Sequence, residues 1–143
     1  MAVRDTTKKP FIDDRDEKVF IGIDLPFRKS EGMDGWFAST TDTISSVKNN
    51  IRNLLKTHQG ERYMQPLFGM GLRRYLFEQI SDETVLLIQN EIVDSFKFWL
   101  PFVEIQDIKV NFNDNSQMDV SVEFNIKQDP NTLESVKVTI QGE

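Results

Sequence analysis

Two adjacent arginines follow a pair of glycines, and this spacing suggests a chemical role more directly than any other in the sequence. Gly69 and Gly71 precede Arg73 and Arg74, which lie in a short stretch, Leu72–Phe77, that we predict to be helical. Guanidinium groups that open a helix can bind an anion, although arginines more often pair with nearby carboxylates. The glycine pair is too short for a phosphate-binding loop, and no Gly-Lys-Ser/Thr sequence follows it. We therefore expect ion pairs at these arginines and no nucleotide cofactor.

Residues that could bind a metal or act as a nucleophile are few. The sequence contains no cysteine, which excludes disulfides, thiolate chemistry and cysteine-based zinc sites. Its one histidine, His58, is predicted in the last turn of a helix, where it would favour the negative helix end. The aspartates in residues 13–16, and the pair Asp114 and Asp119, lack the spacing of a calcium-binding loop. We expect solvated charges and no metal site.

Length and composition are typical of one folded domain. The chain has 143 residues, of which 38% are hydrophobic, and this argues against a disordered chain. A net charge of −6 opposes nonspecific nucleic-acid binding, which requires a basic face. No apolar run approaches the roughly 18 residues of a membrane span, and the N-terminus lacks the apolar core of a signal peptide. The sequence favours a soluble protein, made in the cytoplasm, that binds neither nucleic acid nor membranes.

The chain is predicted to consist of an N-terminal arm followed by a single domain. Residues 1–18 are polar and charged, which is typical of a solvated tail, and the alternative is an arm that becomes ordered on a partner. The domain then covers residues 19–143. At its start, Val19–Ile23 favours a short strand, and the proline and glycines of residues 24–35 favour a loop.

The first of two predicted helices precedes the central glycines. Thr40, Thr41 or Asp42 can cap its N-terminus, and it should end near Thr57–Gly60, with Gly60 as the C-cap. One face carries the apolar residues, and the polar residues fall largely on the other. The apolar residues are Ile44, Val47, Ile51, Leu54 and Leu55, and the polar ones are Lys48, Asn49, Asn50, Arg52 and Asn53.

The second predicted helix is Ser81–Leu100, which Pro101 cannot continue. Its apolar stripe follows the helical period and consists of Val85, Ile88, Ile92, Phe96 and Trp99. Leu86, Leu87 and Val93 widen this stripe, so we expect this helix to be the more buried of the two.

The connection between the helices, Gly60–Glu78, is predicted to be shaped and packed. It contains three of the seven glycines and one of the five prolines, Pro66, so its backbone must turn in defined ways. A plain linker would carry small polar residues. This one carries eight large apolar or aromatic side chains, which implies that much of it is buried: Tyr63, Met64, Leu67, Phe68, Leu72, Tyr75, Leu76 and Phe77.

From Val103 onward the apolar period changes to two, which predicts three strands. The alternation slips at Gln106–Asp107, which suggests a bulge, and turns are expected at Asn113–Asn115 and Asp129–Asn131. The last strand is Leu133–Ile140. A three-stranded antiparallel meander needs cover on its apolar face, and the second helix would supply it. The predicted fold is α+β: two to three helices on a small antiparallel C-terminal sheet, with an extended N-terminal arm.

The predicted last strand could bind another protein. A strand at a sheet edge presents unpaired N–H and C=O groups, which another chain can complete by strand addition. In many proteins such an edge is blunted, and Lys137 could do this here. Both readings stay open from the sequence.

The pattern GER…P.FG.GLR..LFE over Gly60–Glu78 resembles the small baseplate wedge proteins of contractile phage tails, a family often labelled lysozyme-like. The resemblance covers roughly Trp36 to Ile140. It implies a structural joint, located in the virion tail baseplate and assembled in the host cytoplasm. This joint links the wedge to the first sheath ring and templates sheath polymerisation. The implied partners are other wedge subunits, the tail sheath protein, and tube or hub proteins, with no cofactor.

The resemblance also implies which residues contact partners. They lie in the connection, at the proline after the second helix, and on the last strand: Glu61, Arg62, Pro66, Phe68, Gly69, Gly71, Leu72, Arg73, Arg74, Pro101, Val136, Val138 and Ile140. Family members commonly have Glu-Pro-Arg where this chain has Leu100-Pro101-Phe102. The backbone role of the proline can persist, whereas an ion pair made by that triplet cannot.

The lysozyme-like label suggests an alternative function, cleavage of peptidoglycan by Glu61. Glycoside hydrolysis usually requires two carboxylates roughly 5–10 Å apart, and Glu78 is the candidate for the second. The competing interpretation is that Glu61 pairs with Arg62, Arg73 or Arg74 and fixes the connection. We favour this one, because no sugar-binding aromatic platform can be identified.

Overall fold

The computed structural model describes residues 19–32, 35–113 and 117–142. The chain divides into two compact units, with the boundary between Ser46 and Val47. The predicted arm over residues 1–18 lies outside the described residues, and so does most of the predicted turn at Asn113–Asn115. No helix among the described residues is long and apolar enough to cross a membrane.

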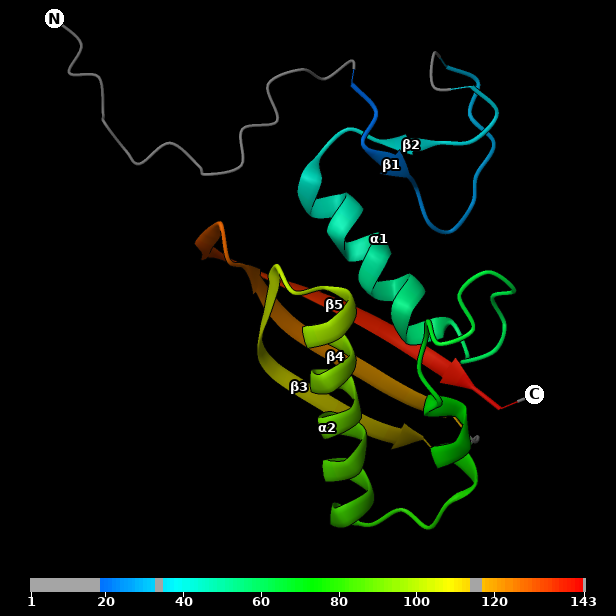
Figure 1. Cartoon of the computed structure of the whole chain (residues 1–143), viewed down its shortest axis with the longest axis vertical. Helices are drawn as coiled ribbons and strands as arrows, with labels where there is room; N and C mark the ends of the chain where they lie inside the picture. The colour runs from blue at the N-terminus through cyan, green and yellow to red at the C-terminus, as the bar shows by residue number, and fades with distance from the viewer. Residues whose placement is uncertain (1–18, 33–34, 114–116, 143) are drawn as a thin grey trace, which may run out of the picture. The chain divides into compact units, whose positions relative to one another are not determined.

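The first unit contains a small two-stranded antiparallel sheet (Figure 1). β1 (Gly22–Ile23) pairs with β2 (Ser39–Thr40), so the strand predicted within Val19–Ile23 is present but short. Backbone bonds extend the pairing, since the Ile21 N–H donates to the Thr40 carbonyl at 2.8 Å. The predicted loop over residues 24–35 contains an additional bridge from Lys29 to Phe37.

The helix α1 (Thr43–Lys56) crosses the boundary between the units. Asp42 caps it, because its carboxylate accepts the Ser45 N–H at 2.8 Å. The predicted C-cap is wrong: the helix ends at Lys56, and both His58 and Gly60 lie beyond it. Asn49 is also buried, against expectation, and its side-chain oxygen accepts a bond from Arg52.

The helix α2 (Asp82–Trp99) begins as predicted, with Ser81 accepting the Thr84 N–H at 3.2 Å. Its buried residues follow one line along the helix: Thr84, Ile88, Ile92 and Phe96. The predicted widening of this stripe is wrong, because Leu86 and Leu87 are 59% and 51% exposed. A helix that covers one sheet face buries one narrow side, so these two leucines lie outside the packed side.

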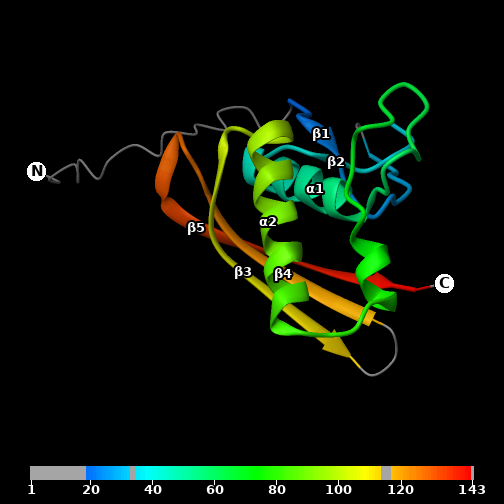
Figure 2. The same ribbon diagram turned by 60° about the horizontal axis from the view of Figure 1, so that its bottom comes forward.

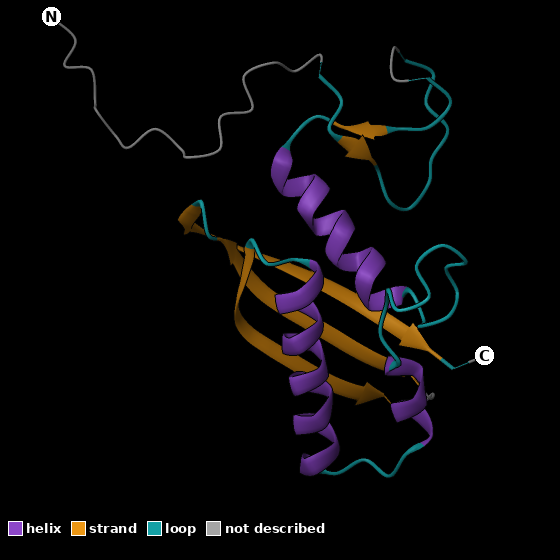
Figure 3. Cartoon of the chain, in the orientation of Figure 1, coloured by secondary structure: helices purple, strands orange, loops and turns teal. Residues whose placement is uncertain are grey.

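The C-terminal sheet has the order β3-β4-β5 and is antiparallel throughout (Figure 3). The strands are β3 (Val103–Asn113), β4 (Gln117–Ile126) and β5 (Asp129–Gln141). The predicted bulge is confirmed, since the register shifts between Ile105 and Asp107. The predicted turn at Asp129–Asn131 is wrong: Ile126 pairs with Asp129, so the chain turns at residues 127–128. Pro130 then lies in an edge strand, where a missing N–H is tolerated.

One face of this sheet forms the core, with α2 and the second-unit part of α1 on the same side of it (Figure 2). The central strand supplies four fully buried residues, Met118, Val120, Val122 and Phe124. The opposite face is polar, where Lys109 lies 3.1 Å from both Asp107 and Glu123. This division into an apolar and a solvated face confirms the α+β class.

Candidate interface at the Gly60–Glu78 connection and the sheet edges

The connection is tied to the end of α1 at Gly69. The Met70 N–H donates to the Thr57 carbonyl at 2.9 Å, and Gly69 has a φ of +106°. A Cβ on Gly69 would lie 2.3 Å from that same carbonyl oxygen, so no other residue fits without a shift of the backbone. A second bond, from the Gly60 N–H to the Pro66 carbonyl at 2.8 Å, closes the loop between them. The predicted shaped connection is therefore present.

Glu61 stabilises the loop through the backbone. Its carboxylate accepts the His58 N–H at 3.0 Å, and none of the three neighbouring arginines forms an ion pair with it. We expected Glu61 to pair with Arg62, Arg73 or Arg74, and this prediction is wrong. Its carboxylate fixes the loop by binding the backbone of His58 instead. The side chain is exposed on a loop and does not line the groove described below.

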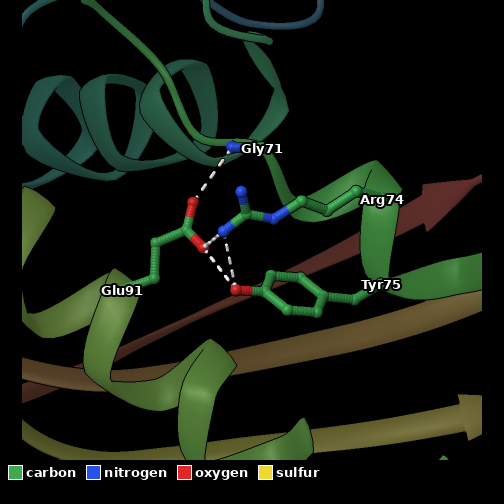
Figure 4. A network of polar contacts seen from close by, with 4 residues as sticks. All are labelled: Gly71, Arg74, Tyr75 and Glu91. Carbon is green, nitrogen blue, oxygen red and sulfur yellow. Dashed lines mark hydrogen bonds and ion pairs between the residues drawn. The ribbon is translucent and has the colours of Figure 1, made fainter. Parts of the chain in front are cut away.

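The short helix η1 (Leu72–Phe77) is held to the middle of α2 by one carboxylate, that of Glu91 (Figure 4). One Glu91 oxygen accepts the Gly71 N–H at 3.1 Å. The other accepts bonds from the Arg74 guanidinium and the Tyr75 hydroxyl, each at 2.7 Å. The predicted ion pair at Arg74 is thus confirmed, with a partner on α2, whereas Arg73 is exposed.

The network also perturbs its own titrating groups. The hydrogen bond with Tyr75 raises the pKa of Arg74, and the charge of Glu91 raises it further. Burial raises the pKa of Tyr75, and its hydrogen bond to Glu91 adds to the rise. Both shifts favour the protonated forms of Arg74 and Tyr75, in which each side chain donates a hydrogen bond to Glu91.

A row of aromatic contacts links the connection to the C-terminus of α2. The Arg62 guanidinium carbon lies 3.9 Å from the centre of the Phe68 ring. Phe68 meets Trp99 edge-on at 5.1 Å, and Trp99 meets Phe98 in the same way at 4.9 Å. The two predicted site residues Arg62 and Phe68 are therefore in direct contact, and Trp99 and Phe98 continue the row along α2.

The expectation that the connection is packed is only half right. Met70, Leu72 and Tyr75 are buried, at 2%, 1% and 5% exposure. Four other large side chains are at least 75% exposed: Tyr63, Met64, Leu67 and Phe77. Their exposure is a property of this loop that the sequence pattern did not predict.

The predicted last strand is a sheet edge, as expected from the sequence. Val136, Val138 and Ile140 are buried in the core, at 1%, 2% and 5% exposure, so β5 offers a partner its backbone and its polar side chains. Lys137 lies 2.9 Å from Asp119 on the solvated face of the sheet. Its ammonium group therefore forms an ion pair with the neighbouring strand β4.

At Pro101, the chain passes from α2 into β3. The Val103 N–H donates to the Leu100 carbonyl at 2.9 Å, and the Phe102 carbonyl accepts the Lys127 N–H. Leu100 is buried, Pro101 is exposed and Phe102 is 38% exposed. The proline keeps its backbone role in a turn, and its neighbours are apolar.

A groove that the sequence did not predict lies between α2 and β3. Gln89, on its helix side, donates to the Ile108 carbonyl at 2.9 Å. The apolar lining comes from Val93, Phe96, Val103 and Ile105, with Glu104, Asp107 and Lys97 among the charged lining residues. The groove therefore runs beside the open edge of β3.

A family model described as baseplate wedge protein gp25 matches residues 41–131, well over half of the chain. The chain belongs to this family. The baseplate wedge protein gp25 of Enterobacteria phage T4 is 24% identical over 98 residues, which cover 68% of this chain and 74% of the T4 protein. The resemblance inferred from the Gly60–Glu78 pattern is confirmed, and the chain is one of the wedge proteins of contractile tail baseplates.

Solved structures have the same fold. A chain of the anti-feeding prophage baseplate, determined with six-fold symmetry, is 25% identical with a TM-score of 0.56, covering 82% of this chain and 81% of its own. A putative tail lysozyme from Geobacter sulfurreducens has a TM-score of 0.62 at 24% identity, with coverages of 71% and 93%. A chain of the post-contraction pyocin R2 baseplate has a TM-score of 0.54 at 19% identity, with coverages of 70% and 97%.

Glu91 is the residue of this wedge-family site that sequence reasoning missed. It lies on α2 beside the buried stripe, three residues after Ile88 and one before Ile92. The sequence did offer a clue, because a carboxylate at the border of an apolar helix face is a candidate partner for Arg73 or Arg74, whose ion-pair partners were not identified. Sequence alone could not say which arginine it meets, because the bond joins residues 17 positions apart.

Proposed function

We propose that this wedge-family chain is a non-enzymatic baseplate subunit that links the wedge to the first sheath ring and templates sheath polymerisation. It would act in the tail baseplate beside other wedge subunits, the sheath protein and the tube or hub proteins. The observation that carries the proposal is the β3-β4-β5 sheet, which ends in an open edge at β5. Family membership supports the location in the baseplate.

The edge of β5 is suited to accept a strand because β5 is long and is held by β4 along its other side. Residues 134–141 pair with β4 in continuous register, from Phe124–Glu134 to Gln117–Gln141. An added strand would continue this register, and its apolar side chains could extend the core face while polar ones extend the solvated face. The sheath protein would thus begin its polymer on a preformed sheet.

A blocked edge tests this proposal. The chain has no cysteine, so Ser135→Cys places one thiol on the exposed side of β5, where a large maleimide polymer can be attached. The labelled full chain should enter baseplates but leave them without sheath. Asn111→Cys on β3, labelled identically, is the matched control and should leave sheath growth normal. Normal sheath on the Ser135-labelled baseplates would contradict the role of this edge.

The non-enzymatic part of the proposal rests on Glu61. Its carboxylate is bound to a backbone N–H on an exposed loop, and Glu61 does not line the groove between α2 and β3. Purified, folded protein should not clear cell walls, and Glu61→Gln should behave identically in that assay. Clearing by the wild type that Glu61→Gln abolishes would establish the peptidoglycan-cleaving alternative.

A further inference from the structure

The loop at the centre of the connection presents three apolar side chains to solvent, which we name the apolar tip: Tyr63, Met64 and Leu67. They are 97%, 87% and 75% exposed, within five consecutive residues. Scattered exposed apolar residues are ordinary, whereas a cluster of this size on one tight loop marks an interaction surface. Large aromatic and flexible thioether side chains are those most enriched at protein interfaces.

The apolar tip is preorganised by the loop that carries it. The Gly60 N–H donates to the Pro66 carbonyl, the Gln65 N–H to the Arg62 carbonyl, and the Phe68 N–H to the Gln65 carbonyl. Glu61 accepts the His58 N–H just beyond the end of α1, and the stacked Arg62 and Phe68 hold the base of the loop to α2 through Trp99. A loop that is ordered before binding loses less conformational entropy on association, which favours a specific contact.

The segment that carries the apolar tip is basic. Residues 56–74 hold four cations and one carboxylate, on a chain whose net charge is −6. Arg74 is paired with Glu91, and the other three cations form no ion pair with a described residue: Lys56, Arg62 and Arg73. A basic segment complements a negative surface and is repelled by a positive one.

We propose that the apolar tip inserts into an apolar pocket, bordered by carboxylates, on another protein subunit of the baseplate. The three exposed apolar side chains would be buried in such a pocket, and the cations that form no ion pair with a described residue favour an acidic rim. This inference rests on the proposed function and specifies which side chains hold the chain in the wedge. None of the three is among the contact residues that the sequence implied.

The test uses the full chain assembled into its own particles. Tyr63 is replaced by the photo-crosslinking residue p-benzoylphenylalanine, and the particles are irradiated and analysed by mass spectrometry. The crosslink should reach a different baseplate subunit, at a pocket lined by apolar residues and bordered by Asp or Glu. A crosslink to a second copy of this chain or to lipid would overturn the proposal.

The number of copies of this chain in each purified baseplate gives a quantitative measure of the contact. Joint replacement Tyr63→Ser, Met64→Ser and Leu67→Ser should lower the copies per purified baseplate at least tenfold, with an unchanged thermal midpoint because all three side chains are exposed. Ile80→Ser, at 62% exposure, is the matched control and should incorporate normally. Arg73→Glu should lower incorporation several-fold. Full incorporation of the triple variant would overturn this inference alone, whereas absence of the wild type from baseplates would overturn the proposed function.

Discussion

At the scale of single residues, Gly69 and Glu91 determine the shape of the connection. Gly69 lets the chain approach the end of α1 closely, and Glu91 binds three donors that arrive from Gly71, Arg74 and Tyr75. Neither role involves chemistry on a substrate. Both place an exposed loop at a fixed position relative to the core.

Gly69→Ala should destabilise the protein by about 2–4 kcal/mol, because the added methyl clashes with a backbone carbonyl and the φ of +106° is strained for alanine. Gly60→Ala is the control, since its φ is +92° but its methyl would meet open space, and it should cost about 1 kcal/mol. Urea unfolding of both variants measures the difference. Equal losses would show that the close approach at Gly69 is unimportant.

Glu91→Gln should lower the free energy of unfolding by about 1–2 kcal/mol. The amide keeps one acceptor but loses the charge that Arg74 and Tyr75 share, and the partial exposure of Arg74 limits the loss. Asp94→Asn, on the exposed side of the same helix, should change stability by less than about 0.5 kcal/mol. The pair is compared by chemical denaturation at pH 7, and an equal effect would contradict the network.

At the scale of elements, the sheet carries a charge arrangement that responds to acid. On the solvated face, the Thr139 hydroxyl donates to Asp119 at 2.6 Å, and the Lys137 ammonium lies 2.9 Å away. The hydrogen bond from Thr139, together with Lys137, lowers the pKa of Asp119. These contacts join β4 to β5, the strand whose edge we propose to receive the sheath.

A lowered carboxyl pKa contributes stability that is present above the unfolded pKa and lost as pH falls through the folded pKa. The wild type should therefore lose thermal stability below about pH 4, the ordinary aspartate range. Asp119→Asn should lose less between pH 6 and pH 2.5, and Thr139→Val should be intermediate. Thermal scans across this range measure the slopes, and parallel slopes for all three proteins would contradict the assignment.

The elements themselves were largely readable from the sequence, because local periodicity determines them. The alternation at Met118 to Ile126 and the slip at Gln106–Asp107 predicted β4 and the bulge of β3. The turn near Pro130 was misplaced because proline usually marks a turn, whereas here an edge strand tolerates it. Leu86 and Leu87 were predicted to be buried because they lie beside the apolar stripe of α2. The sequence shows where this stripe lies on the helix, but it does not show how wide a strip of the helix the sheet covers.

At the scale of the whole molecule, one unit combines a closed core with an open edge and an exposed loop. The predicted contact residues fall into three groups: those of the connection, Pro101 at the turn into β3, and those of β5 whose side chains are buried. The pattern over Gly60–Glu78 predicted the shaped connection, which the structure confirms. It could not separate structural from surface residues there, because Met64 and Met70 are the same residue type at opposite extremes of exposure.

The measurement that tests the central claim most directly is electron microscopy of particles assembled with and without this chain. We expect particles that lack it to show baseplates or bare tubes with no attached sheath, and addition of the wild type to restore sheathed tails. Complete, sheathed tails in its absence would contradict the role in sheath initiation.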